Sequence, residues 1–325
     1  MIEKIRLALE LNCLVNPARP LVVGVSGGPD SLSLLDVLNR LNYHVIPAHL
    51  DHKIRPESAN DVKQVEKIVA AMGLKVVLAV EDVPSFARQN RLSLEEAARE
   101  KRYNFLFSVA RQYNAQGVAT AHTADDQVET VCLHLLRGSG LKGLIGMEHR
   151  TLRHPWDPSI PLVRPLLGVW RSQIEEYIVE NNLIPIEDRS NLDVHYRRNR
   201  IRHELLPYMQ SYNPQIKKAL WKLSRLLSAD EDFLQHAMLP AWDKCIAWKE
   251  KNAVGILRNP FLALHLALQR RILQHACLIL TRGSFDGGYE IVERARDWIK
   301  QDHRQGRCDL ADGLILAIED DIAWL

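Results

Sequence analysis

Residues 21–31 read LVVGVSGGPDS, a short β-branched apolar run that ends in a turn rich in glycine and serine. Leucines at helical spacing follow directly, so the pattern predicts a strand, a tight turn and a helix in succession. Gly27 and Gly28 let the backbone of the turn bring its N–H groups close to an anion. A helix beginning near Pro29 adds the positive end of its dipole. The junction therefore predicts a phosphate-binding site.

The side chains of this turn limit the kinds of ligand that we expect it to bind. Ser26 and Ser31 supply hydroxyl donors for phosphate oxygens. Asp30 would repel a bare phosphate, so a cation has to lie between the two. The predicted ligand is the pyrophosphate portion of a nucleotide together with Mg²⁺.

Three other interpretations of the turn compete with this one. A Walker loop is excluded, because it needs a Lys after its second glycine, where this sequence has Pro29 and Asp30. A trypsin-like protease also carries a Ser-Gly-Gly-Pro run, but on a β-barrel rather than within an α/β alternation. The last alternative is a strand-to-helix turn that binds nothing, and the flanking serines and Asp30 weigh against it.

Length and composition limit the class of protein. The 325 residues suit two or three domains of roughly 100–200 residues each. A net charge of +2 excludes a uniformly basic surface but permits a local basic patch. No apolar run approaches the about 20 residues that span a membrane, and the N-terminus is not a signal peptide. We therefore expect a cytoplasmic protein with no membrane contact.

The cysteines give little support to a disulfide framework or a zinc ribbon. There are five of them, an odd number, widely spaced and without a C-x-x-C pair.

Alternating patterns predict an α/β domain with a doubly wound parallel sheet and helices on both faces. Polar clusters follow three of its strands, so we expect them to meet at the carboxyl-end edge, where such sheets bind ligands. The predicted strands occupy 21–25, 44–50, 75–80 and 117–122, and the helices 31–41, 58–72, 93–113 and 124–137.

Regularity weakens beyond Gly138, where a Pro-rich stretch (154–167) and a helix (170–182) follow. From Asn213 onward the pattern is mostly helical, with a last helix near 289–301 and a hairpin turning at 311–313. We place a boundary near Asn213-Pro214. It separates a catalytic domain at 1–213 from a smaller, mostly helical domain at 214–325, which we expect to contact RNA.

A second polar cluster begins the last helix of the α/β pattern. Asp126 and Glu129 lie three residues apart and share a helix face, with His122 and Asp125 beside them. Helix capping explains acidic residues in a first turn, and Thr123 with Asp126 forms half a capping box. Three carboxylates and a histidine opposite a phosphate loop exceed what capping requires. Mg²⁺ or an ammonium group is the simplest partner.

Two groups of arginines stand out. Arg102 has no Glu at i−4 and is a better functional candidate than Arg99, which a salt-bridged helix face explains. The most basic window lies farther along, and fits contact with a nucleic-acid backbone, although a solvated charged face is the alternative. Its residues are Arg197, Arg198, Arg200 and Arg202, followed by Lys217 and Lys218.

The run Ser26-Gly27-Gly28-Pro29-Asp30-Ser31 resembles the SGGxDS loop of the N-type ATP pyrophosphatases, the PP-loop superfamily. Further motifs, from residue 20 to about 210, narrow the resemblance to the tRNA(Ile)-lysidine synthetase family. They are Asp51-His52 with Arg55-Pro56-Glu57-Ser58, Ala98-Arg99 with Arg102-Tyr103, His122 with Asp125-Asp126 and Glu129-Thr130, Arg137-Gly138-Ser139-Gly140-Leu141, Arg164-Pro165-Leu166-Leu167, Asp188 with Ser190-Asn191, and Tyr196 with Arg198-Asn199 and Arg202-His203-Glu204.

This resemblance implies an adenine nucleotide α-hydrolase-like fold and a ligase reaction in two steps. ATP adenylates the C2 oxygen of the wobble cytidine of tRNA(Ile) with a CAU anticodon, releasing pyrophosphate. The ε-amine of free lysine then attacks C2 and displaces AMP to give lysidine. Codon recognition changes from AUG to AUA, and tRNA identity from Met to Ile.

The resemblance also implies roles for individual residues. Catalysis falls to Asp30, Arg102, Asp126 and Glu129, the last three also binding lysine, while Asp30 and Asp126 hold Mg²⁺. The six residues of the loop, with His52, Arg55 and His122, bind ATP. The basic window contacts the tRNA.

Longer members of the family carry a second C-terminal domain, and this sequence ends after one helical region. How the tRNA acceptor end is recognised is therefore left open, and so is the question of whether the protein forms a homodimer.

An enzyme that forms 2-thiocytidine in tRNA is the nearest alternative function, but its chemistry needs cysteines. A non-catalytic RNA-binding protein with a vestigial nucleotide fold is another, and the intact Ser26, Asp30, Asp126 and Glu129 argue against it.

Overall fold

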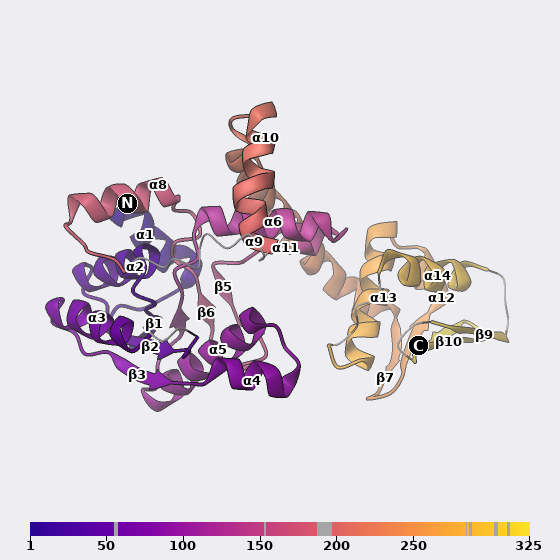
Figure 1. Cartoon of the computed structure of the whole chain (residues 1–325). Coiled ribbons are helices and arrows are strands. Elements are labelled where there is room, and N and C mark those ends of the chain that lie inside the picture. The colour runs from indigo at the N-terminus through magenta and orange to yellow at the C-terminus, as the bar shows by residue number, and fades with distance from the viewer. Residues whose placement is uncertain are drawn as a thin grey trace. The chain divides into compact units, whose positions relative to one another are not determined.

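The structure is a computed structural model, shown in Figure 1. It describes the chain except residues 55–57, 153, 187–196, 284, 286–287, 302–304 and 311–312. Internal contacts divide the chain into two compact units, Met1–Arg225 and Leu226–Leu325. The division falls inside the long helix α11 (Ile216–Cys245), beyond Asn213-Pro214. The role expected for the second unit stays a prediction.

A six-stranded sheet forms the centre of the first unit. All its pairings are parallel except that of β5, which runs antiparallel at one edge. Because β2 and β3 lie on one side of β1 and β4 and β6 on the other, strand order reverses at β1, which marks the ligand-binding edge of such a sheet. The predicted doubly wound fold is confirmed. In spatial order the strands are β3 (Val77–Val80), β2 (Val45–Asp51), β1 (Leu21–Gly24), β4 (Val118–Ala119), β6 (Leu162–Val163) and β5 (Arg150–Thr151).

Strand β1 shows why both faces of this sheet are covered. Val23 packs into an apolar cluster with α2 and α8, whereas its neighbour Val22 packs into another with Tyr103 and Phe107 of α5. Alternate residues of a strand face opposite sides, so a strand apolar at every position needs helices on both. Figure 1 shows α1, α2 and α8 on one side and α5 on the other. The helices of this unit before α11 are α1 (Ile2–Leu7), η1 (Ala8–Cys13), α2 (Pro29–Arg40), α3 (Ser58–Ala71), α4 (Val83–Asn90), α5 (Leu94–Gln112), α6 (Ala124–Leu136), α7 (Leu141–Leu144), α8 (Arg171–Glu180), α9 (Arg197–Arg200), η3 (Ile201–Leu205) and α10 (Leu206–Tyr212).

The second unit combines helices with a small antiparallel sheet. Its core contains Ile256 from the sheet and Ile272 and Ile299 from the helices, all fully buried. The helical character predicted here is present, and the sequence pattern indicated the sheet only at the hairpin formed by β9 and β10. The strands, in spatial order, are β7 (Ile246–Lys249), β8 (Val254–Leu257), β11 (Ile322–Trp324), β10 (Ile315–Glu319) and β9 (Gln305–Asp309), and the helices are α12 (Arg258–Leu262), α13 (Leu266–Leu280) and α14 (Tyr289–Lys300).

None of the described helices is long and apolar enough to cross a membrane.

Candidate active site

The glycine-rich turn between β1 and α2 is held in shape by its own side chains. Gly27 has a φ of 87°, and a Cβ there would lie 2.7 Å from Ile186 Cδ1, so no larger residue fits. The Ser31 hydroxyl accepts the N–H of Ser26 at 3.1 Å, and the Ser26 hydroxyl accepts the N–H of Gly28 at 3.3 Å. The two serines thus set the backbone conformation of the turn before any phosphate binds.

A cavity of about 710 Å³ opens beside this turn, at the carboxyl ends of β1, β2 and β4. That volume suits a nucleotide or a substrate of similar size. Arg55 lies outside the described residues, and Gly27, Gly28 and Pro29 belong to the turn without lining the cavity. The other residues predicted for ATP, lysine or metal all line it, namely Ser26, Asp30, Ser31, His52, Arg102, His122, Asp126 and Glu129.

Asp126 divides its two carboxylate oxygens between the helix and the cavity. One oxygen, Oδ2, accepts the backbone N–H and the hydroxyl of Thr123, both at 2.8 Å. Thr123 returns the contact by accepting the Asp126 N–H, which completes the capping box that the sequence half predicted. The other oxygen, Oδ1, lies 3.6 Å from Arg202 Nη2. Capping therefore accounts for only one of the two oxygens.

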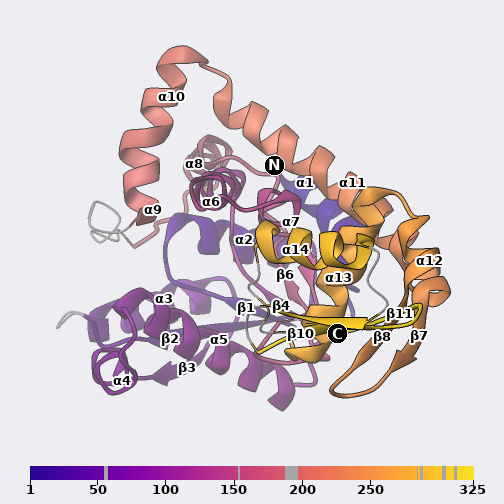
Figure 2. The same cartoon turned by 90° about the vertical axis from the view of Figure 1, so that its right-hand side faces the viewer.

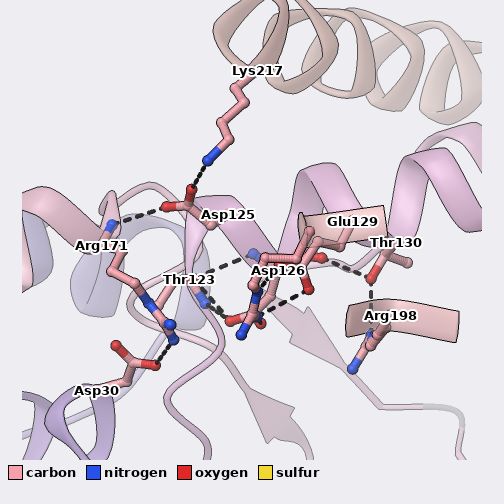
Figure 3. A network of polar contacts seen from close by, with 10 residues as sticks. Asp30, Thr123, Asp125, Asp126, Glu129, Thr130, Arg171, Arg198 and Lys217 are labelled. Atoms are coloured by element: carbon pink, nitrogen blue, oxygen red, sulfur yellow. Dashed lines mark hydrogen bonds and ion pairs between the residues drawn. The ribbon is translucent and has the colours of Figure 1, made fainter. Parts of the chain in front are cut away.

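Glu129 lies one helical turn farther on, and its side chain is only 1% exposed. Arg202 forms a bidentate ion pair with Glu129: Nε lies 2.6 Å from Oε1, and Nη2 lies 3.1 Å from Oε2. Burial raises the pKa of Glu129 above its ordinary value, and the hydrogen bonds from Arg202 oppose this only in part. Nearby, Arg198 donates to the Thr130 hydroxyl at 3.0 Å (Figure 3).

Asp30 faces the same space from the first turn of α2. Its Oδ2 lies 3.0 Å from Arg171 Nη2, while its buried Oδ1 has no hydrogen-bond partner among the described residues (Figure 3). Burial raises the pKa of Asp30, Arg171 lowers it, and the nearby charge of Asp126 raises it further. The missing partner and the second carboxylate both favour a cation at this point.

The sequence analysis did not identify Arg171. Its backbone N–H donates to Asp125 Oδ2 at 2.9 Å, and Lys217 Nζ lies 3.0 Å from the other oxygen of that carboxylate. Arg171 therefore connects α8 to both Asp30 and Asp125 (Figure 3). A single arginine at the start of a helix carries no motif, and no sequence signal would have revealed it.

Asp30 and Asp126 together fit Mg²⁺. In the part of the chain that the structure describes, no three His, Cys, Asp or Glu side chains converge on one point. Mg²⁺ does not need three, because it commonly takes one or two carboxylates and completes its shell with substrate phosphates and water. The unpartnered Oδ1 of Asp30 and the proximity of Asp126 supply that minimum.

Two histidines that line the cavity, His52 and His122, are neutral at pH 7. Burial lowers the pKa of His52 to about 4, with Arg102 contributing. Burial and the charges of several arginines, Arg164 first, hold the pKa of His122 well below its ordinary value. His122 Nδ1 lies 2.9 Å from the Thr120 hydroxyl. Such rings can exchange hydrogen bonds with a neutral base without adding charge.

The basic window predicted to contact RNA divides into two groups. Arg198 and Arg202 line the cavity and Lys217 binds Asp125, so these three face α6. Arg197, Arg200 and Lys218 are exposed, and Arg200 pairs loosely with Glu204 on the next turn. Residues four apart on one helix lie on the same side, so the spacing of Arg198 and Arg202 agrees with their shared direction.

Comparisons with known proteins identify the family of the domain that contains this cavity. A family model described as a PP-loop domain matches residues 3–209. Among curated proteins, the chain is 35% identical over 280 residues to a tRNA(Ile)-lysidine synthase of Clostridioides difficile, 36% over 288 residues to one of Geobacillus kaustophilus, and 37% over 294 residues to one of Geobacter sulfurreducens. The matches cover 84%, 87% and 88% of this chain but 59%, 61% and 61% of those proteins. The chain thus spans about three fifths of their length.

Among solved structures, a U34-tRNA thiolase from Methanococcus maripaludis, described with its 4Fe-4S cluster, matches with a TM-score of 0.55. The match covers 70% of this chain and 79% of the thiolase at 16% identity. At that identity the likeness concerns the fold.

Proposed function

Since the chain belongs to the PP-loop domain family, we propose that it is an ATP-dependent ligase acting on tRNA. It joins free lysine to C2 of the wobble cytidine of tRNA(Ile) with a CAU anticodon, forming lysidine, AMP and pyrophosphate. One observation carries the proposal: a single cavity is lined by Ser26 and Ser31 of the glycine-rich turn, by Arg102, and by the carboxylates of Asp30, Asp126 and Glu129. The names of the curated relatives supply the substrate.

The first step is adenylation of the cytosine. The backbone of the Ser26–Ser31 turn and the N-terminus of α2 bind the phosphates of ATP. Asp30 and Asp126 hold Mg²⁺, which when bound neutralises phosphate charge and stabilises the leaving pyrophosphate. The cytosine C2 oxygen attacks the α-phosphorus, a P–O bond forms, and the bond to pyrophosphate breaks. The neutral rings of His52 and His122 contact the uncharged parts of the nucleotide.

In the second step, the uncharged ε-amine of lysine attacks C2 of the adenylated cytosine. An N–C bond forms, the C2–O bond breaks, and AMP leaves with the oxygen. Arg102 binds the carboxylate of lysine, because a guanidinium matches a carboxylate in shape and charge. Asp126 and Glu129 bind lysine while its side chain is still an ε-ammonium, and loss of a proton to solvent then gives the uncharged amine that attacks. Both reactions take place in the space that these residues line.

The exposed cations of the basic window, Arg197, Arg200 and Lys218, contact phosphates of the tRNA. Arg198 and Arg202 act inside the cavity instead, because their side chains bind residues of α6. The window thus contributes to RNA binding on one side and to the active site on the other. Because the proposed reaction uses tRNA, ATP and free lysine, we expect the enzyme to act in the cytoplasm.

The test is incubation with CAU-anticodon tRNA(Ile), ATP, Mg²⁺ and labelled lysine. We expect label in the RNA, located by nucleoside analysis at the wobble cytidine, and one AMP released per lysine joined. A transcript carrying uridine at the wobble position is the control and should take up no label. Incorporation of sulfur would favour the thiolation alternative, although none of the described residues lining the cavity is a cysteine. RNA binding without AMP release would favour a non-catalytic protein.

A further inference from the structure

We infer that Arg202 occupies the place on Glu129 that the ammonium group of lysine takes during the reaction. RNA that binds the outer side of the same helical segment withdraws Arg202, so lysine binds tightly only after the RNA. This inference rests on the proposed function and adds an order of binding to it.

Arg202 contacts both oxygens of the Glu129 carboxylate. Nε and Nη2 each approach a different oxygen of the carboxylate, at 2.6 and 3.1 Å, so both oxygens are engaged. Arg202 Nη2 also lies 3.6 Å from the cavity-facing oxygen of Asp126. The two carboxylates assigned to the lysine ammonium are therefore both in contact with one guanidinium. Lysine and Arg202 compete for the same charge.

Exchange of the Arg202 guanidinium for the ammonium group of lysine keeps the negative charge of Glu129 compensated. The Glu129 side chain is 1% exposed, and burial alone would favour its neutral form. Removal of Arg202 without replacement leaves a buried carboxylate unpaired, which is strongly unfavourable. An ammonium group supplies the missing charge. Lysine binding should therefore accompany the departure of Arg202.

The position of Arg202 in the chain suggests what withdraws it. α9 and η3 follow one another and lead into α10 along one helical segment (Figure 2). Within this segment Arg198 and Arg202 point to α6, while Arg197 and Arg200 are exposed. Phosphates bound to the outer arginines act on the same helical turns that hold Arg202. In addition, η3 is a π-helix, a rare form that is often found at functional sites.

The experiment measures lysine binding to the full chain without RNA, by calorimetric titration and by thermal unfolding. Wild-type protein, Arg202→Met and Arg202→Lys are compared, with L-lysine as ligand and norleucine, which lacks the ε-ammonium, as its control. We expect Arg202→Met to bind lysine at least tenfold more tightly than wild type and to be stabilised by it. Arg202→Lys keeps the positive charge but cannot form the bidentate contact, so its affinity for lysine should lie between those of wild type and Arg202→Met. This variant tests the inference even if Arg202→Met folds poorly.

A matched ion pair in the second unit supplies the protein control. Arg271 also binds a glutamate, Glu231, with both arms, and both side chains are largely buried. Arg271→Met should lose stability, and lysine should not restore it. Addition of CAU-anticodon tRNA should raise the lysine affinity of wild type toward that of Arg202→Met.

Equal or weaker lysine binding by both Arg202 variants would overturn the inference, because Arg202 would then help to hold lysine or leave it unaffected. So would a wild-type lysine affinity that does not change with tRNA. Neither result touches the proposed function, which depends on lysine incorporation by the wild-type protein and fails separately if no label enters the RNA.

Discussion

Two glutamates in this protein receive an arginine Nε at the same distance, and their pKa values are shifted in opposite directions. Glu129, in the first unit, receives Arg202 Nε at 2.6 Å, and Glu293, in the second, receives Arg270 Nε at 2.6 Å. The pKa of Glu129 is raised, because burial outweighs its partner. The pKa of Glu293 is lowered, because hydrogen bonds from Arg270 outweigh burial and Arg296 adds more at 2.9 Å.

The difference separates a carboxylate that stabilises the fold from one that is held ready for a ligand. Glu293 has two cationic partners and more solvent, so its charge is well compensated. Glu129 is almost fully buried with one bidentate partner, and its neighbour Asp30 has a buried oxygen without one among the described residues. Incompletely compensated charge in a cavity is common at functional sites.

The largest effect is expected at Asp30. Replacement by Ala should lower ATP consumption by about 10²–10³-fold, the usual loss when a group that stabilises transition-state charge is removed. The fold should survive, because burial raises the pKa of Asp30 and its charge does not favour the folded state. Pyrophosphate release and circular dichroism measure the two. Normal turnover in the folded variant would mean that this turn does not bind the pyrophosphate.

A smaller and more selective effect is expected from Glu129→Gln. Adenylation of the tRNA should continue, while the lysine concentration needed for half-maximal rate rises roughly 10- to 100-fold, as for loss of one charged hydrogen bond. Rapid-quench detection of adenylated tRNA separates the two steps. Glu293→Gln is the matched control and should leave the lysine requirement unchanged. Loss of adenylation at saturating lysine would instead assign Glu129 to metal binding.

The basic window should respond differently on its two sides. Gln at Arg197, Arg200 or Lys218 should weaken tRNA binding a few-fold and reduce the slope of log affinity against log salt by about one per charge removed. ATP affinity should stay constant. Arg198→Gln should alter ATP or lysine use and leave the salt slope nearly unchanged. Filter binding of tRNA across a salt series measures these slopes. Equal slopes for Arg198→Gln and for the variants of the exposed residues would contradict the division of the basic window into two groups.

Sequence reasoning located the phosphate turn and the carboxylate cluster, because both depend on patterns within about ten residues. β1 ends before the expected turn and α2 starts from it, and Thr123 with Asp126 caps α6 as half predicted. The bond between Arg202 and Glu129 joins residues 73 positions apart, and no local pattern encodes such a pair. For the same reason the cavity-facing direction of Arg198 was not foreseen. Assignment of individual roles to these residues stays a prediction.

The second unit was harder to predict for a related reason. β7 and β8 are four residues each, and β7 directly follows the 30-residue helix α11, so both strands are too short to show alternation clearly. β8 then pairs with β11, about 65 residues away along the chain, through the register of Ile256 with Ala323. The pairs β7–β8, β9–β10 and β10–β11 each join strands close together in sequence, and the sequence pattern indicated only the hairpin of β9 and β10.

The smallest expected effect is the pH dependence of stability, which is also the most direct test of the difference between Glu129 and Glu293. The pKa of Glu293 lies below its ordinary 4.5 in the folded state, so its contribution is present above pH 4.5 and is lost as pH falls through the folded pKa. The pKa of Glu129 lies above 4.5, so stability is complete below pH 4.5 and declines as pH rises through the folded pKa. Gln resembles the protonated acid in both places.

At pH 7 Glu293→Gln should therefore be less stable than wild type, by no more than about 1 kcal/mol for a partly solvated ion pair. Glu129→Gln should be equally or more stable, since it removes a buried charge whose ionisation opposes folding. Both differences should shrink as pH falls toward 4. Hydrogen exchange of peptides from α14 and α6 reports each unit separately. Destabilisation of equal sign in both variants at pH 7 would show that Glu129 and Glu293 play the same structural role.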